Sequence, residues 1–210
     1  MNIINEIQKE INKLKNSKMA KPTYQELMDA GVHFGHMKRK WNPKMQPNIF
    51  MERKGIHIID LNRTDVEMDR AAKALKQIAA SGKKVLFVAT KKQARDIVSK
   101  AALSVGMPFV VDRWLGGMMT NFSTIRKSVK KMQTIDTMLA DTSLTSVTKK
   151  EKLTLTRERN KLERVLGGIA NLNRLPGAIF IVDIGHEHIA LAEATKLGMR
   201  TFGKRASPEA

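Results

Sequence analysis

The stretch RWLGGMMTNF, residues 113–122, lies between a region of short apolar runs and a long segment rich in lysine and arginine. Gly116 and Gly117 permit backbone angles that are closed to residues with a Cβ atom, and they let another segment approach closely. Thr120 and Asn121 are both suited to capping the N-terminus of a following helix. The stretch therefore predicts a junction between a buried sheet and a helical arm, with both glycines in special backbone conformations.

The same stretch begins with Arg113 and Trp114, which place a guanidinium beside an indole. A guanidinium binds phosphate through two parallel hydrogen bonds, and an indole can stack on a nucleic-acid base. A large aromatic side chain is equally suited to packing beneath the arm. We expect Arg113 to contact phosphate and Trp114 to have mainly a packing role.

The segment 121–166 has the pattern of two paired helices joined by a polar tip at residues 141–146. Apolar residues that recur three and four positions apart predict an antiparallel two-helix coiled coil. Glu158 or Arg159 falls where an apolar residue is expected, which predicts locally weaker pairing or a bend. Between residues 126 and 164, eleven Lys and Arg against five Asp and Glu give a net charge of +6, part of which is the usual solvated face. The expected apolar positions are Phe122, Ile125, Val129, Met132, Ile135 and Leu139, then Leu155, Leu162, Val165, Leu166 and Ile169.

Two continuous apolar runs flank this segment, residues 85–89 before it and 178–182 after it. Such runs are typical of strands that are buried on both faces of a parallel sheet. Each is followed by a helical pattern, over residues 91–104 and 186–197, and then by a further short apolar run. These features predict an α/β fold with a mostly parallel sheet flanked by helices, in a flavodoxin-like or Rossmann-like layering, and a protruding antiparallel two-helix coiled coil.

The composition of the chain limits the classes of partner. It has 38 Lys and Arg against 20 Asp and Glu, so its net charge of +18 repels itself unless a polyanion is bound. No run of about 18 apolar residues is present, so we expect no membrane span. The absence of cysteine excludes disulfides and thiolate metal sites and fits a reducing compartment. Nucleic acid is therefore the expected partner.

A first group of cations that could bind RNA phosphate follows the apolar run 85–89 at once. Lys91, Lys92 and Arg95 open the next helix, so they are expected at the carboxyl end of the sheet beside free backbone N–H groups. The segment is neither a Walker loop nor a G-x-G-x-x-G turn. We therefore expect an RNA phosphate there and not a bound nucleotide.

A second group lies in residues 32–43, which we expect to form a loop ahead of a β-hairpin at residues 49–52 and 56–61. Three cations at residues 38–40 supply charge for phosphate, and Trp41 supplies a face for stacking on a base. The alternative is an ordinary solvated charge run with Trp41 packed inward.

The case for catalysis is weak. Imidazoles and carboxylates can share a metal ion, but the candidate residues lack the H-E-x-x-H spacing, so no metal or other cofactor is expected. No serine lies in a G-x-S-x-G elbow. The alternative classes are an RNA-processing enzyme and a coiled-coil interaction protein with incidental charge. The metal candidates are His33, His36, Asp183, His186 and His188.

Several motifs, in order along residues 21–203, resemble the ribosomal small-subunit protein S2 family of bacteria and organelles. The resemblance implies an α/β domain with a protruding coiled coil, seated on small-subunit rRNA near the junction of head and body, without catalysis. It also implies a cytoplasmic location and contacts with neighbouring ribosomal proteins, including protein S1 in many bacteria. The motifs are DAGVHFGH (29–36), WNPKM (41–45), WLGGMMTNF (114–122), KLERVLGGI (161–169), RLPGAIFIVD (174–183) and HEHIALAEATKLGMRTFG (186–203).

On this resemblance we expect residues 19–120 and 167–210 to form one discontinuous rRNA-binding domain, with residues 121–166 as its arm. Residues 1–18 form an extension, helical or disordered, that the resemblance does not cover. After Gly203 the chain departs from the family pattern of an Asp- and Asn-rich stretch and a final helix, so we expect an incomplete sheet. The expected rRNA-binding residues are Lys38, Arg39, Lys40, Trp41, Lys91, Lys92, Arg95, Arg113, Asn121 and Arg126.

Overall fold

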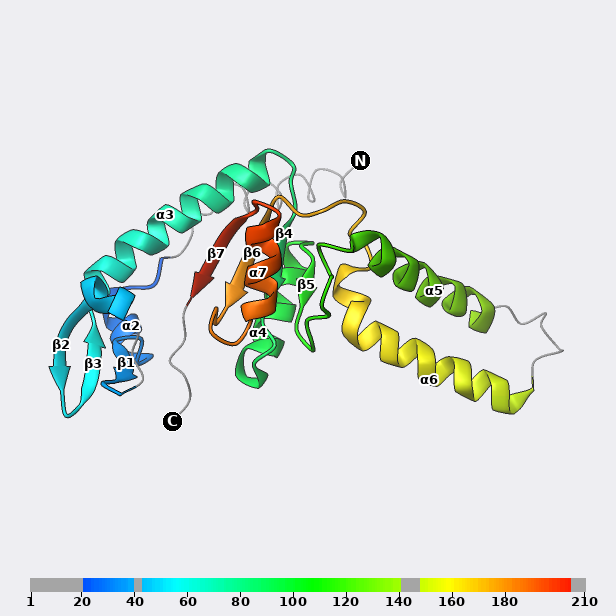
Figure 1. Cartoon of the computed structure of the whole chain (residues 1–210), viewed down its shortest axis with the longest axis horizontal. Coiled ribbons are helices and arrows are strands. Elements are labelled where there is room, and N and C mark those ends of the chain that lie inside the picture. The colour runs from blue at the N-terminus through cyan, green and yellow to red at the C-terminus, as the bar shows by residue number, and fades with distance from the viewer. Residues whose placement is uncertain (1–20, 40–42, 141–147, 205–210) are drawn as a thin grey trace, which may run out of the picture. The chain divides into compact units, whose positions relative to one another are not determined.

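The computed structural model describes residues 21–39, 43–140 and 148–204 (Figure 1). The extension expected at residues 1–18 and the polar tip at 141–146 lie outside the described residues. The chain divides into two compact units, Met1–Glu67 and Met68–Ala210. Helix α3 (Leu61–Ala80) begins in the first unit and ends in the second.

The first unit contains a small antiparallel sheet with the strand order β1-β3-β2. Lys54 and Gly55 connect β2 to β3 with φ angles of 53° and 75°, as a tight hairpin turn requires. The predicted hairpin is thereby confirmed. The elements of this unit are α2 (Tyr24–Asp29), β1 (Phe34–Met37), a 3-10 helix η1 (Pro43–Asn48), β2 (Ile49–Arg53) and β3 (Ile56–Ile59).

Strand β1 corrects the expectation that residues 32–43 form a loop. It pairs antiparallel with β3 through Phe34 opposite Ile58 and Met37 opposite Ile56. A Cβ atom on Gly35 would lie 2.8 Å from the carbonyl oxygen of His57, so the missing side chain lets the two strands approach. A four-residue strand with a central glycine carries too little apolar alternation to be recognised from the sequence.

The second unit is built on a four-stranded sheet with the order β5-β4-β6-β7, in which every pairing is parallel (Figure 1). The predicted α/β class, with a parallel sheet flanked by helices, is confirmed. The elements after α3 are β4 (Val85–Val88), α4 (Lys92–Ser104), β5 (Phe109–Val110), α5 (Phe122–Ala140), α6 (Lys149–Leu166), a 3-10 helix η2 (Gly167–Ile169), β6 (Ala178–Val182), α7 (His188–Lys196) and β7 (Arg200–Lys204).

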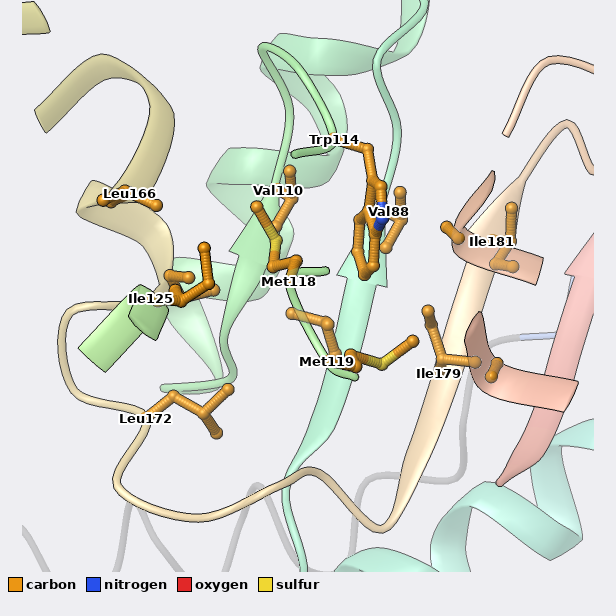
Figure 2. Close-up of a cluster of buried hydrophobic side chains, with 14 of the residues drawn as sticks. Val88, Val110, Trp114, Met118, Met119, Ile125, Leu166, Leu172, Ile179 and Ile181 are labelled. Atoms are coloured by element: carbon orange, nitrogen blue, oxygen red, sulfur yellow. The ribbon is translucent and has the colours of Figure 1, made fainter. Parts of the chain in front are cut away.

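Both faces of this sheet are covered, because alternate residues of β4 and β6 belong to two different apolar clusters. Leu86 and Ile179 pack with Ala190 and Ala194 of α7 and with the start of α5, whereas Val85 and Ala178 pack with Leu75 and Ile78 of α3. Figure 2 shows the first cluster. Burial on both faces explains why these strands appear in the sequence as unbroken apolar runs.

Helices α5 and α6 run side by side in the second unit (Figure 1). The stripe predicted on α5 is buried at Ile125, Val129, Met132 and Ile135. At residues 158 and 159, where the pattern predicts an apolar residue, Glu158 pairs with Lys131, and Arg159 pairs with both Asp136 and Glu163. Ion pairs between the two helices therefore occupy the position where the sequence predicted weaker pairing.

Candidate nucleic-acid interface

One carboxylate organises the loop that leads from β5 into α5. Oε1 of Glu193, on α7, accepts hydrogen bonds from the indole N–H of Trp114 (3.0 Å) and the backbone N–H of Gly117 (2.8 Å). Its Oε2 accepts from the backbone N–H groups of Met119 (3.0 Å) and Thr120 (2.9 Å) and from the Thr120 hydroxyl (3.1 Å). Since α7 packs on the sheet, these five donors hold the loop, and with it the start of α5, against the sheet.

Glu193 is 8% exposed, and this burial by itself would raise the pKa of its carboxyl group. Hydrogen bonds from Thr120, Trp114, Met119 and Gly117 outweigh the burial, so the pKa of Glu193 lies below its ordinary value. The side chain is therefore a carboxylate at neutral pH, and its charge is stabilised by hydrogen-bond donors.

Trp114 is 7% exposed and belongs to the same buried cluster as Val88, Val110 and Met118 (Figure 2). The packing role that we favoured for Trp114 is confirmed. Its indole N–H, which would otherwise be buried without a partner, is satisfied by Glu193. The ring therefore has no open face on which a base could stack.

The two glycines of the junction differ. Gly117 has a φ of 84°, which an L side chain rarely adopts, and its carbonyl oxygen accepts from the backbone N–H of Asn121 (2.8 Å). Gly116 is not among the positive-φ glycines, and a Cβ atom there would meet nothing within 4 Å. The expectation of a special conformation is right for Gly117 and wrong for Gly116, because a single left-handed residue is enough to turn the chain.

At the carboxyl edge of the sheet, side chains that follow β4 bond to side chains that follow β6. Nζ of Lys91 lies 2.6 Å from a carboxylate oxygen of Asp183. The backbone N–H of Thr90 donates to Glu187 (3.0 Å), and its hydroxyl contacts the same oxygen. Lys92 is exposed. Carboxylates of the chain itself thus occupy part of the edge where we expected an RNA phosphate.

Arg95 is also bound within the fold. Its Nη1 lies 3.2 Å from Oδ1 of Asp112 and its Nη2 donates to the Asp112 carbonyl oxygen (3.1 Å). Oδ2 of Asp112 lies 3.0 Å from Nε of Arg164 on α6. Asp112 therefore links the start of α4 to the end of α6.

The remaining predicted residues of the second unit lie near the start of α5. Arg113 and Asn121 are exposed. The side-chain oxygen of Asn121 accepts from the Thr124 hydroxyl (2.9 Å). Arg126 is partly buried, and its Nη1 donates to the carbonyl oxygen of Leu172 (3.1 Å), so it ties α5 to the segment that leads into β6.

In the first unit, the predicted cationic run follows β1. Lys38 pairs with Glu52 of β2 (3.2 Å), and its backbone N–H donates to Gly55 (2.9 Å). Arg39 is exposed. Lys40 and Trp41 lie outside the described residues. This run therefore extends directly from a paired strand.

The part of the chain that the structure describes contains no group of three His, Cys, Asp or Glu side chains that could hold a metal ion. Of the candidate ligands, Asp183 bonds to Lys91 and to the backbone N–H of Gly185 (3.1 Å). In the same residues, no helix is both long and apolar enough to cross a membrane.

Comparison with known proteins assigns the family. The family model described as ribosomal protein S2 matches residues 27–205. The chain belongs to the ribosomal protein S2 family. It is 61% identical over 179 residues to small ribosomal subunit protein uS2 of Cytophaga hutchinsonii, an alignment that covers 85% of this chain and 70% of that relative. The proteins of the same name from Parabacteroides distasonis and Bacteroides fragilis are each 58% identical over 185 residues, covering 88% of this chain and 66% of each relative. The chain thus spans about two thirds of the length of these relatives.

The sequence of this S2-family chain gave no prediction for three acidic residues that organise the site, Asp112, Glu187 and Glu193. One feature of the sequence could have indicated the role of Glu193. It lies on the face of α7 that carries Ala190 and Ala194, both fully buried. A charged residue among small buried residues of a short helix indicates a buried carboxylate with partners.

Proposed function

We propose that the chain is a structural component of the small ribosomal subunit that binds rRNA and helps to dock neighbouring ribosomal proteins during translation. The observation that carries this proposal is the S2 family match over residues 27–205. The net charge of +18 supports it, because the mutual repulsion of so many cations favours binding to a polyanion. The family is a ribosomal one, so the chain is a cytoplasmic ribosomal component and not an enzyme.

We further propose that residues 19–120 and 167–210 form the rRNA-binding domain, that residues 121–166 form its protruding antiparallel coiled coil, and that residues 1–18 are an extension. The lateral packing of α5 and α6, their buried stripe and their ion pairs support the coiled coil. The segment separates β5 from β6 in the chain, although both strands flank β4 in one sheet. Protein S1 is proposed as one of the neighbours.

Exposure supports some of the proposed rRNA contacts more strongly than others. Lys92, Arg113 and Arg39 are exposed and can reach a phosphate without losing an internal bond. Lys91 and Arg95 pair with carboxylates, so their ammonium and guanidinium groups would be shared between the fold and a phosphate. We propose that these two residues act mainly by shaping the edge from which Lys92 extends.

The proposal is tested by binding the full chain to in vitro transcribed small-subunit rRNA of Cytophaga hutchinsonii at several salt concentrations. The logarithm of the affinity should fall linearly with the logarithm of the salt concentration, with a slope of roughly −0.7 to −0.9 per phosphate contact. Replacing Lys38, Arg39 and Lys40 together with Gln should reduce the slope and leave the melting temperature unchanged. An affinity that does not respond to salt would favour a coiled-coil interaction protein with incidental charge.

A further inference from the structure

The acidic side chains of α5 and α6 are already engaged within the helix pair. Each accepts an ion pair or closes a helix cap, so none is available to neutralise the other cations of the two helices. Glu158 pairs with Lys131, Asp136 and Glu163 pair with Arg159, and Glu151 bonds to Thr148 in the capping box of α6.

Three of the remaining cations form one stripe on α6. Lys150, Arg157 and Lys161 are spaced seven and four residues apart, a spacing that places them within about 60° of the helix circumference, together with Arg164. All three are exposed, and within the described residues none has an acidic partner. At a rise of about 1.5 Å per residue, the stripe from Lys150 to Lys161 is about 16 Å long.

The stripe is continuous with the carboxyl edge of the sheet. Arg164 lies at its end nearest the sheet and shares the carboxylate of Asp112 with Arg95, at distances of 3.0 Å and 3.2 Å. One carboxylate between two guanidiniums fixes the junction of α6 with α4, and Lys92 is exposed at the start of α4. Positive charge therefore extends from the sheet edge along the outer side of α6.

We propose that the Lys150–Arg157–Lys161 stripe binds the phosphate backbone of an RNA duplex. The inference rests on the proposed function, since it assigns a further surface for the same RNA partner. Like charges spaced along a rigid rod match the repeated charges of a backbone. Binding of single strands relies on aromatic side chains on which bases stack, and α6 contains none, which favours a duplex.

The test compares two full-length variants that lose the same charge. Lys150→Gln, Arg157→Gln and Lys161→Gln remove the stripe. Lys73→Gln, Lys76→Gln and Lys100→Gln remove three exposed lysines of α3 and α4 and serve as the matched control. The probes are a 24-base-pair RNA duplex of arbitrary sequence and the transcribed small-subunit rRNA. Because the stripe variant can no longer neutralise three phosphates, its slope of log affinity against log salt should become shallower by about 2 to 3 on both probes. The control should change by less than about 1 on the same scale.

Equal losses in the two variants would overturn the proposal, because the effect would then come from net charge alone. A stripe variant that binds both probes like the wild type but is depleted from reconstituted subunits would also overturn it, since the stripe would then contact protein. If the wild type binds neither probe, the proposed function fails and not the stripe alone. Circular dichroism checks folding, and a Lys150→Arg, Arg157→Lys, Lys161→Arg variant should restore the slope.

Discussion

Replacing Glu193 with glutamine preserves the shape of the side chain but exchanges one acceptor oxygen for an amide group that only donates. In the wild type, the two carboxylate oxygens accept five hydrogen bonds, two at Oε1 and three at Oε2. Either orientation of the glutamine amide therefore directs an NH₂ group at two or more donors. In the less costly orientation, the indole N–H of Trp114 and the backbone N–H of Gly117 lose their acceptor.

A buried donor without an acceptor costs about 1–3 kcal/mol. Two such donors give an expected loss of about 2–6 kcal/mol in the free energy of unfolding for Glu193→Gln. The lower half of this range is favoured, because the hydrogen bond of Gly117 is only partly buried. Even the lower limit exceeds the effect of an ordinary surface substitution.

Urea denaturation measures the loss, with the fluorescence of Trp114 as reporter in a Trp41→Phe background. Glu151→Gln is the matched control, because glutamine can replace glutamate in a capping box, and it should leave the midpoint near that of the wild type. An unchanged urea midpoint for Glu193→Gln would refute the conclusion that Glu193 holds the loop between β5 and α5 in place.

Comparing the wild type with Glu193→Gln also gives a prediction for how stability depends on pH. The pKa of Glu193 is lowered in the folded protein, so the unfolded chain binds the proton more readily. Its contribution to stability is fully present above the ordinary glutamate pKa of about 4.3 and is lost as the pH falls through the lowered pKa of the folded state. The stability difference between wild type and Glu193→Gln should therefore narrow on acidification below that value.

Four further substitutions test the same region by urea denaturation, followed by circular dichroism because one of them removes Trp114. Gly117→Ala forces a Cβ atom onto a φ of 84° and should lower the free energy of unfolding by about 1–2 kcal/mol. Gly116→Ala should be neutral or stabilise the fold by up to about 1 kcal/mol. Equal effects of the two substitutions would contradict the assignment of the special conformation to Gly117 alone. Trp114→Ala should cost about 3–5 kcal/mol, and a variant of wild-type stability would contradict the packing role. Gly168→Ala would place a Cβ atom 2.2 Å from the carbonyl oxygen of Phe109, so it should lower the midpoint more than Gly116→Ala does, and a smaller effect would mean that this contact relaxes freely.

The sequence was sufficient to predict helices and strands whose pattern runs through many consecutive residues. β4 and β6 were recognised because burial on both faces leaves unbroken apolar runs, and α5 because its buried residues recur at helical spacing. The expected boundaries differ from the observed ones by one or two residues, as at the start of α7, which begins at His188 and not at His186. Strand β1 was not predicted, because its pairing with β3 depends on a glycine and not on an apolar pattern.

The site was less predictable because its bonds join residues that are distant in the sequence. Trp114 and Glu193 are 79 residues apart, and Thr90 and Glu187 are 97 apart. No local pattern pairs such residues. The sequence therefore pointed to the loop and to candidate cations, but it did not predict which carboxylates bond to them, and it named Asp183 only as a metal candidate. It also assigned equal weight to Gly116 and Gly117, since identical residues in series do not reveal which one carries the positive φ.

The position of those carboxylates bears on where RNA can bind. In open parallel sheets, ligands bind outside the carboxyl ends of strands at the point where the strand order reverses, which here lies between β4 and β6. Asp183 has a φ of 70°, rare for a residue other than glycine, and its carboxylate bonds to Lys91 at 2.6 Å across this point. A residue keeps such a backbone conformation only when the surrounding bonds hold it there. The hydrogen bond from Thr90 reaches Glu187, which lies close to Asp183 in the same loop. Internal bonds therefore fill the place where other sheets of this kind hold a ligand. Exposed cations that can reach a phosphate, among them Lys92, Arg113 and the stripe on α6, lie outside it.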